Sequence, residues 1–215
     1  MVKDIVIIGA GGFGREVQWL IESINEKSGE WNILGYIDDC IPVGTEIDGY
    51  RVLGSCEDLF KYKDSLAVAC AVGASQTRKK IIEYISANDN ISFPNLIAPT
   101  VVASNRIAYG MGNIICAGNI LTVDITIGNF NIINLDCTVG HDVRIESYVT
   151  LYPSANISGN VFLGAKAEVG TGCHVIQGIS IGEEAILGAG SVVIRDIPDK
   201  CTAVGSPAKV IKQRN

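Results

Sequence analysis

Histidine is scarce in this chain, and long apolar runs are absent. The 215 residues include two histidines and scattered carboxylates, without the spacing typical of a metal site. No apolar run has the length of a membrane helix, and residues 1–8 lead directly into a predicted strand rather than a signal peptide. The net charge of −6 leaves no basic stripe for nucleic acid. We therefore expect no metal, no membrane span and no nucleic-acid partner.

Disulfide signals are also missing. The seven cysteines are an odd number, and no Cys-x-x-Cys pair occurs among them. The composition is that of a globular protein, with 47% hydrophobic and 19% charged residues. We interpret the thiols as reduced core residues of a cytoplasmic protein. A chain of this length can form one large domain or two small ones.

An aliphatic residue recurs every six residues between 115 and 193, and the register never changes. The positions are Ile115, Leu121, Ile127, Ile133, Val139, Ile145, Leu151, Ile157, Leu163, Val169, Val175, Ile181, Leu187 and Val193. A period of six fits neither a helix nor a simple strand. It predicts one short strand plus one corner, so that three faces close a coil of eighteen residues and the coils stack.

Small residues repeat at fixed offsets from the aliphatic position. Glycine often follows it directly, as at Gly140 and Gly164, and a small or β-branched residue lies four positions after it, as at Cys137 and Ala155. We expect the aliphatic side chain to point inward, the small residue to fill the corner, and the glycine to permit the turn.

The repeat resembles the hexapeptide-repeat, left-handed parallel β-helix of acyltransferases, and the handedness is what this resemblance implies. We assign residues 96–215 to the β-helix. The first coil is expected to be irregular around residues 105–112, because Tyr109 breaks the aliphatic pattern. After Val193, two prolines stop regular pairing and predict a C-terminal cap.

Residues 1–95 show a different, Rossmann-like α/β pattern with a small parallel sheet. Buried strands are predicted at residues 2–8, 33–37 and 66–72, with a short one at 91–93; helices are predicted at 15–26 and 77–87, with a weak one at 57–62. The ligand crevice of such a sheet lies at the carboxyl ends of its strands, near Gly9 to Gly14, Asp38–Asp39 and Gly73.

A Gly-x-Gly-x-x-Gly match at Gly9, Gly11 and Gly14 lies between the first strand and the first helix. In this context the glycines allow a tight turn, access to an anion and close helix packing. The unit is short for NAD, and a mononucleotide diphosphate, as in a nucleotide sugar, fits it better. Glycines that only pack helix against strand remain an alternative.

The two histidines differ in position. His141 lies at a predicted corner, two residues after Val139, with Asp142 beside it; His174 precedes Val175 and points outward from a flat face. A neutral imidazole can accept a proton near pH 7, and a neighbouring carboxylate can hold its tautomer. His141 is therefore the candidate base.

The order of these parts, an α/β unit with the glycine turn followed by a hexapeptide solenoid with a His-Asp corner, resembles the bacterial sugar acetyltransferases of the sialic-acid O-acetyltransferase type. These include N-acetyltransferases of nucleotide-linked 4-amino sugars, which act in lipopolysaccharide, capsule or glycoprotein biosynthesis. The resemblance covers essentially the whole chain. It implies a cytoplasmic homotrimer that transfers acetyl from acetyl-CoA, without a metal, to the amine of a nucleotide-linked sugar.

The resemblance also implies residue roles. His141 is the general base, Asp142 orients it, and the Gly159 backbone N–H supports the oxyanion. The residues implied for the nucleotide sugar are Gly11, Gly12, Asp38 and Asp39, and those implied for acetyl-CoA are Thr150, Gly159, Thr171 and Ala189. The crevice at the strand ends adds Gly73 as a substrate-binding candidate, and Asn134, one coil side before His141, is a candidate sugar contact. The family commonly has histidine where this chain has Thr150, which leaves the identity of the acyl donor open.

Two alternatives to N-acetylation remain. The first is O-acetylation of a sugar such as sialic acid, which shares the fold and the base. The second is a catalytically silent scaffold that binds nucleotide sugars, against which the His141–Asp142 pair argues. A serine acetyltransferase would call for a helical N-terminal domain.

Overall fold

The computed structural model describes residues 2–214. The chain forms two compact units, residues 1–99 and residues 100–215.

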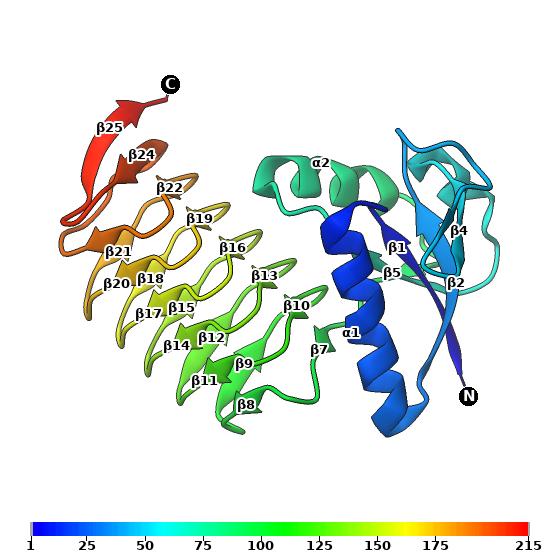
Figure 1. The fold of residues 1–215 in the computed structure, drawn as a ribbon, viewed down its shortest axis with the longest axis horizontal. Coiled ribbons are helices and arrows are strands. Elements are labelled where there is room, and N and C mark those ends of the chain that lie inside the picture. Colours follow the sequence, from blue (N-terminus) through cyan, green and yellow to red (C-terminus); the bar gives the residue numbers. More distant parts are fainter. Residues whose placement is uncertain (1, 215) are drawn as a thin grey trace. The chain divides into compact units, whose positions relative to one another are not determined.

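The first unit is an α/β sandwich around a six-stranded sheet (Figure 1). Its strands are β1 (Lys3–Ile8), β2 (Trp31–Ile37), β3 (Glu46–Ile47), β4 (Tyr50–Gly54), β5 (Leu66–Cys70) and β6 (Ile91–Ser92), in the order β3-β4-β2-β1-β5-β6. Its helices are α1 (Gly12–Ser28), the 3₁₀ helix η1 (Cys56–Lys61) and α2 (Ser75–Ile85), and a short strand β7 (Leu96–Ile97) follows.

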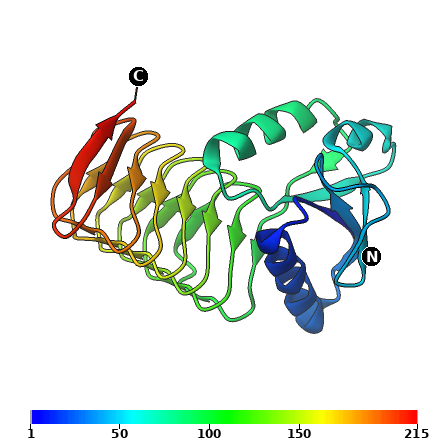
Figure 2. The ribbon, with the colours of Figure 1, turned by 45° about the horizontal axis from the view of Figure 1, so that its top comes forward.

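The connections of this sheet explain where the helices lie. The β1–α1–β2 and β5–α2–β6 units step outward in opposite directions from the centre. Right-handed crossovers then place α1 and α2 on opposite faces, as Figure 2 shows. Helices on both faces bury the central strands, so Ile5, Val6 and Ile7 are fully buried. The topological switch point lies between β1 and β5, where ligands bind in such sheets.

The predicted strands and helices of this unit are present, and β1, β2, β4, β5 and β6 pair in parallel as expected. β3 pairs antiparallel with β4, so the sheet is mixed and larger than expected. Asp48 and Gly49 form the connecting turn with positive φ angles of 46° and 86°. An Asp-Gly pair with these angles is a strong hairpin signal, and the sequence interpretation missed it.

The second unit is a solenoid of three parallel sheets (Figure 1). Sheet I contains β10 (Ile114–Ile115), β13 (Ile132–Ile133), β16 (Thr150–Leu151), β19 (Glu168–Val169) and β22 (Ile186–Leu187). Sheet II contains β8 (Val102–Ala103), β11 (Ile120–Leu121), β14 (Thr138–Val139), β17 (Asn156–Ile157), β20 (His174–Val175) and β23 (Val192–Val193). Sheet III contains β9 (Ile107–Tyr109), β12 (Ile125–Ile127), β15 (Arg144–Ile145), β18 (Phe162–Leu163) and β21 (Ser180–Ile181).

From β8 to β23, each paired strand residue lies opposite the residue eighteen positions later, as Val139 does with Ile157 and Ile145 with Leu163. All fourteen aliphatic positions are buried, with exposed fractions of 0–2%. The small residues four positions on fill the corners, and Cys137 and Ala155 are fully buried. The stack of aliphatic side chains is therefore the core of this unit.

The role expected for the glycines was wrong. The left-handed residue of each corner lies three positions after the aliphatic one and is usually not glycine; Asp142 (φ 61°), Asn160 (φ 55°) and Lys166 (φ 62°) are examples. The glycine directly after the aliphatic residue serves close approach instead. A Cβ on Gly140 would lie 2.6 Å from the Gly159 nitrogen. Successive coils meet backbone to backbone at these positions.

The expected irregularity of the first coil was also wrong. Ala103 pairs with Leu121 and Tyr109 with Ile127, in the same eighteen-residue register as the rest. Register is set by backbone hydrogen bonds, which do not require an aliphatic side chain.

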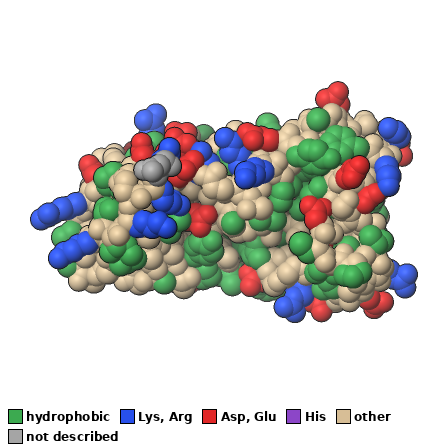
Figure 3. Space-filling view, turned by 90° about the horizontal axis from the view of Figure 1, so that it is seen from above, with side chains coloured by type: hydrophobic (Ala, Val, Ile, Leu, Met, Phe, Trp, Pro, Cys, Tyr) green, Lys and Arg blue, Asp and Glu red, His purple; other side chains and the backbone are tan. Residues whose placement is uncertain are grey.

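The C-terminal cap is a hairpin of β24 (Cys201–Val204) and β25 (Lys209–Gln213), with β24 paired to β22. β25 is exposed along its whole length. Figure 3 shows Lys and Arg side chains gathered over this end of the solenoid. Charged side chains such as Lys209 and Lys212 protect an edge strand against pairing with another chain.

Candidate active site

His141 lies at the corner that follows β14, between sheets II and III. The next residue, Asp142, adopts the left-handed conformation of the corner, which aspartate tolerates better than most residues. This places Asp142 Oδ2 2.8 Å from His141 Nδ1. Both side chains are about half exposed, at 51% and 59%. The predicted His-Asp pair therefore forms as a consequence of the corner geometry.

The pair fixes which imidazole nitrogen can act as a base. A carboxylate oxygen only accepts hydrogen bonds, so Nδ1 carries the proton and donates it to Asp142. Nε2 then carries the lone pair and can accept a proton from a reactant. The nitrogen opposite a carboxylate partner is the one that acts in general-base catalysis.

The next coil packs directly against the imidazole. Gly159, which is buried, lies where a Cβ would be 2.4 Å from His141 Nε2. Asn160 N–H donates to the His141 carbonyl at 2.7 Å. Two residues of the next coil, eighteen and nineteen positions later, thus fix the ring and the backbone of His141.

A cavity of about 250 Å³ lies on sheet II beside this corner. It is lined by Thr122, Thr138, Val139, Gly140, Asn156, Ile157 and Ser158. Thr138 Oγ1 donates to Asn156 Oδ1 at 2.7 Å, and Asn156 Nδ2 donates to the Ser154 carbonyl. The lining combines apolar surface with hydrogen-bonded polar side chains, and it includes Gly140, the residue before His141.

The other candidate residues of the solenoid lie on a different side of the coil. Asn134 is half-buried at the corner after β13, where its Oδ1 accepts from the Leu135 N–H. Thr171 and Ala189 are exposed at equivalent corners of later coils. Thr150 is buried in sheet I, with an exposed fraction of 1%. Ligand contacts at these residues stay predictions, and the burial of Thr150 argues against one.

The glycine turn of the first unit has the expected form. Gly9 takes a φ of 95°, and a Cβ on Gly14 would lie 1.9 Å from the Gly9 carbonyl oxygen, so both glycines serve the tight turn and helix packing. Gly11 and Gly12 are exposed at the start of α1, and a Cβ on either would meet no atom within 4 Å. The first backbone N–H groups of α1 are open to an anion there.

Asp38 and Asp39 follow β2 but differ in environment. Asp38 accepts hydrogen bonds from the Ala10, Cys40 and Ile41 N–H groups at 2.9–3.1 Å. Partial burial opposes ionisation of this carboxyl, yet the three N–H donors lower its pKa. Asp38 therefore ties the glycine turn to the end of β2.

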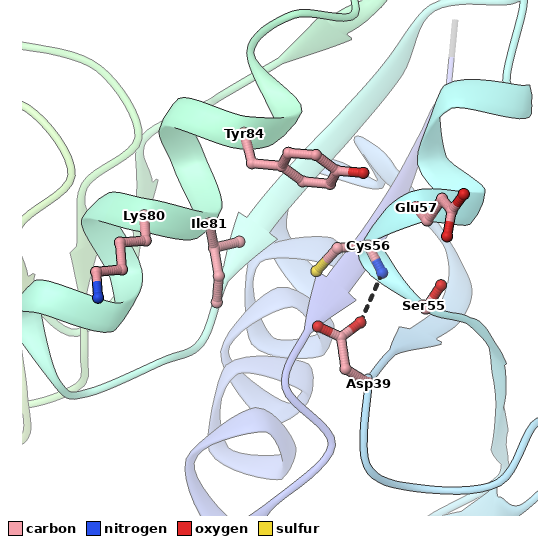
Figure 4. A pocket seen from close by; sticks show the side chains of 7 residues that line it. All are labelled: Asp39, Ser55, Cys56, Glu57, Lys80, Ile81 and Tyr84. Atoms are coloured by element: carbon pink, nitrogen blue, oxygen red, sulfur yellow. Dashed lines mark hydrogen bonds between the residues drawn. The ribbon is translucent and has the colours of Figure 1, made fainter.

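Asp39 instead lines a cavity of about 390 Å³ (Figure 4). The other lining residues are Ser55, Cys56, Glu57, Lys80, Ile81 and Tyr84. Asp39 Oδ1 accepts from the Cys56 N–H at 2.8 Å, which holds the carboxylate at the floor. Burial and then the neighbouring Asp39 raise the pKa of the Cys56 thiol to about 12, so this thiol stays protonated. Tyr84 forms the opposite wall and packs edge-on against Phe60 at 5.2 Å.

Gly73 follows β5, where its carbonyl accepts a hydrogen bond from Arg78 Nη1 at 2.9 Å. Arg78 is fully buried and also donates to the Val72 carbonyl. This guanidinium shapes the loop after β5. Gly73 does not line the cavity that contains Asp39.

Sequence reasoning missed the cavity-lining side chains on α2. Lys80 and Tyr84 are one helical turn apart, so they share a face, but nothing in the sequence showed that this face meets Asp39. Thr138 and Asn156 were missed as well. They are eighteen residues apart and precede core positions, so the repeat itself was a sufficient signal.

Over residues 2–214, no group of three or more His, Cys, Asp or Glu side chains could hold a metal ion. Within the same described range, no helix combines the length and apolar character needed to cross a membrane.

Comparison with known proteins identifies a matching family model and solved structures that are similar to this chain. A family model described as the PglD N-terminal domain matches residues 4–85. PerB from Caulobacter crescentus, solved in complex with CoA and GDP-perosamine, is 31% identical with a TM-score of 0.89, and the match covers 99% of both chains. The acetyltransferase domain of PglB from Neisseria gonorrhoeae, in complex with acetyl coenzyme A, is 30% identical with a TM-score of 0.90 over 98% of this chain and 100% of that one.

Curated relatives match over shorter stretches. Serine acetyltransferase from Bacillus subtilis is 37% identical over 84 residues, which is 38% of this chain and 39% of that protein. The chain spans between a third and about two-fifths of the length of such relatives.

The fold and the His141 corner define a hexapeptide-repeat acyltransferase with an α/β unit before the solenoid. Since PerB and the PglB domain match at 30–31% identity along nearly the full length of both chains, the chain belongs to the hexapeptide-repeat family of nucleotide-amino-sugar N-acetyltransferases. The left-handed parallel β-helix and the acyltransferase class expected from the sequence are thereby confirmed.

Proposed function

We propose that this protein transfers the acetyl group of acetyl-CoA to the amine of a nucleotide-linked 4-amino sugar. The observation that carries the proposal is the His141–Asp142 pair, which leaves Nε2 as the base nitrogen; the preceding residue, Gly140, lines a cavity on sheet II. The full-length similarity to PerB, described with CoA and GDP-perosamine, supports both ligand classes.

The proposed reaction is direct acyl transfer. The sugar amine attacks the thioester carbonyl while His141 Nε2 removes its proton, and Asp142 stabilises the imidazolium through Nδ1. The Gly159 backbone N–H supports the oxyanion. The attack forms the C–N bond of a tetrahedral intermediate, and collapse of this intermediate restores the carbonyl and breaks the C–S bond. The CoA thiolate then leaves and takes up a proton.

The proposed nucleotide site is the cavity of the first unit, and residues 1–95 are the proposed nucleotide-sugar-binding domain. Asp39 offers one carboxylate oxygen, Oδ2, to a donor on the base, since Oδ1 accepts from Cys56. Tyr84 offers an aromatic wall for the flat base. The diphosphate would meet the N–H groups of Gly11 and Gly12 at the start of α1. Both carboxylate oxygens of Asp38 already accept hydrogen bonds from backbone N–H groups. Asp38 would therefore support nucleotide binding indirectly, by holding the glycine turn in position.

For residues 96–215 we propose the acyltransferase role, with acetyl-CoA along the solenoid near Thr171 and Ala189 and Asn134 near the sugar. We also propose a homotrimer in the cytoplasm, where acetyl-CoA and nucleotide sugars are made. Thr150 is the weakest of the proposed contacts because it is buried.

The test is thiol release from acetyl-CoA with a panel of UDP-, GDP- and dTDP-linked 4-amino sugars, alongside free sialic acid. We expect one nucleotide amino sugar to give an N-acetylated product in equal amount to the released thiol. Turnover with sialic acid alone would replace the proposal with O-acetylation. Binding of both ligands without turnover across the panel would favour the silent scaffold.

A further inference from the structure

Gly159 is glycine although its backbone does not require it. Its φ lies outside the left-handed region, and the left-handed residue of this corner is Asn160, with φ 55°. The same offset from the aliphatic residue holds Ala165 and Ala189 at other corners. An alanine is therefore compatible with the corner conformation, and the reason for glycine must lie in what surrounds it.

The imidazole of His141 occupies the space where a side chain would begin. A Cβ on Gly159 would lie 2.4 Å from Nε2, 2.5 Å from Cε1 and 2.8 Å from Cδ2 of His141. Real Cβ atoms do not approach other atoms so closely, so an added methyl group and the present ring position are incompatible. The edge of the ring that meets Gly159 is the edge that carries the base nitrogen.

We propose that Gly159 is a positioning residue: its lack of a side chain seats the His141 imidazole and sets where Nε2 points. Three contacts then fix His141. Asp142 holds Nδ1 at 2.8 Å, Asn160 N–H holds the carbonyl at 2.7 Å, and Gly159 supports the ring. This role is separate from donation by the Gly159 N–H, which alanine would retain, and it rests on the proposed function of His141 as base.

The consequence of adding a methyl group depends on what can move. His141 is 51% exposed, so its side chain can rotate away from Gly159 into solvent at little cost to the fold. Gly140 provides the contrast, because a Cβ there would meet backbone atoms of Ser158 and Gly159 at 2.6–2.8 Å, which cannot rotate away. Gly159→Ala should therefore displace the base while the solenoid stays folded.

The kinetic test compares Gly159→Ala, His141→Ala and the double variant, with Ala165→Gly as a matched control that changes one methyl group at another corner. We expect Gly159→Ala to lower kcat by about 10- to 100-fold, the effect of a misplaced reacting group, with KM for both substrates nearly unchanged. In the His141→Ala background the same substitution should cause no further loss. An equal loss of kcat in the wild-type and His141→Ala backgrounds would overturn the proposal. The effect would then come from the Gly159 N–H or from the fold.

A second readout does not depend on activity. The chain has two histidines, so a ¹H–¹³C spectrum of ring-labelled protein contains two Cε1–H signals, and His174 serves as an internal reference. Gly159→Ala should shift the His141 signal and leave that of His174 in place. An unchanged His141 signal would contradict the positioning role. Should His141→Ala prove fully active, this spectrum still decides the proposal independently of the proposed function.

Stability provides the remaining check. Any loss of Tm in Gly159→Ala should be recovered in the double variant, because removal of the ring leaves room for the new methyl group. A loss that persists without the ring would show that Gly159 serves backbone packing, as Gly140 does, and would overturn the proposal.

Discussion

The two units assemble their candidate sites in opposite ways. In the α/β unit, the cavity wall combines Asp39 after β2, residues 55–57 at η1, and Lys80 and Tyr84 from α2. In the solenoid, the site consists of residues 140–142 and their neighbours eighteen positions later, 158–160. A periodic backbone therefore converts sequence spacing into contact, whereas the α/β unit brings together segments that no spacing relates.

The units also use glycine differently. In the α/β unit, Gly11 and Gly12 face open space where a ligand can approach. In the solenoid, Gly140 and Gly164 face the backbone of the next coil, at 2.5–2.6 Å from an added Cβ. The first kind of glycine affects binding and the second affects stability, and substitutions can separate the two.

The largest effect is expected at the solenoid corner that carries the base. His141→Ala should lower kcat by about 10²- to 10⁴-fold, because general-base catalysis contributes this much. Asp142→Asn should have a smaller effect of the same kind, since it removes the carboxylate that holds Nδ1. His174→Ala, on the outer face of sheet II, is the control and should be fully active. An unchanged kcat in His141→Ala would refute the assignment.

The next effect contrasts glycines of the two units. Gly140→Ala should destabilise the solenoid by about 1–3 kcal/mol, the usual cost of overpacking, because the new Cβ meets backbone atoms. Gly12→Ala should leave stability unchanged or slightly raised, because alanine favours a helix and meets no atom within 4 Å. Its effect should appear as a higher KM for the nucleotide sugar. Thermal unfolding and steady-state kinetics of Gly140→Ala and Gly12→Ala test this contrast. Equal losses of stability in the two variants would contradict it.

Within the α/β unit, the neighbouring aspartates should separate structure from binding. Asp38→Asn should cost about 1–2 kcal/mol at neutral pH, because it weakens charge-assisted bonds to three N–H groups. The pKa of Asp38 is lowered in the fold, so its stabilisation is present above the unfolded value near 4 and is lost as the pH falls below it.

The difference in unfolding free energy between wild type and Asp38→Asn should therefore shrink below about pH 4. Asp39→Asn should show no comparable loss at neutral pH. A gap for Asp38→Asn that stays constant down to pH 2 would contradict the role given to its ionised carboxylate.

The smallest effect concerns a contact between coils. Lys166 Nζ lies 2.8 Å from Glu183 Oε1 and 2.6 Å from Glu184 Oε1. Because both acids retain solvent exposure, Lys166→Gln should cost less than about 1 kcal/mol, with the loss reduced at high salt. A larger, salt-independent loss would show that the side chain acts through packing.

Much of the solenoid was predictable, because its core, register and corners follow from one period. The His141–Asp142 pair could be located from the same period, and the structure adds the 2.8 Å contact. The function of the repeated glycines could not be read from the sequence, because turn formation and close approach both select glycine. Only the backbone distances at Gly140 distinguish these causes.

The α/β unit was predictable as a set of strands and helices, but its cavity was not. Asp38 and Asp39 are adjacent in sequence and chemically identical. Their difference arises from the glycine turn, whose Ala10 N–H reaches Asp38, and from Cys56, whose N–H reaches Asp39. Such long-range partners are set by tertiary packing, which no local pattern encodes.

The most direct test of this division between binding and chemistry is a comparison of kcat and KM for the nucleotide amino sugar in Asp39→Ala and His141→Ala. The account predicts that Asp39→Ala raises KM by about 10- to 100-fold, the value of a charge-assisted hydrogen bond, with kcat largely kept. It predicts that His141→Ala lowers kcat with KM kept. A loss of kcat in Asp39→Ala equal to that in His141→Ala, or an unchanged KM in Asp39→Ala, would contradict it.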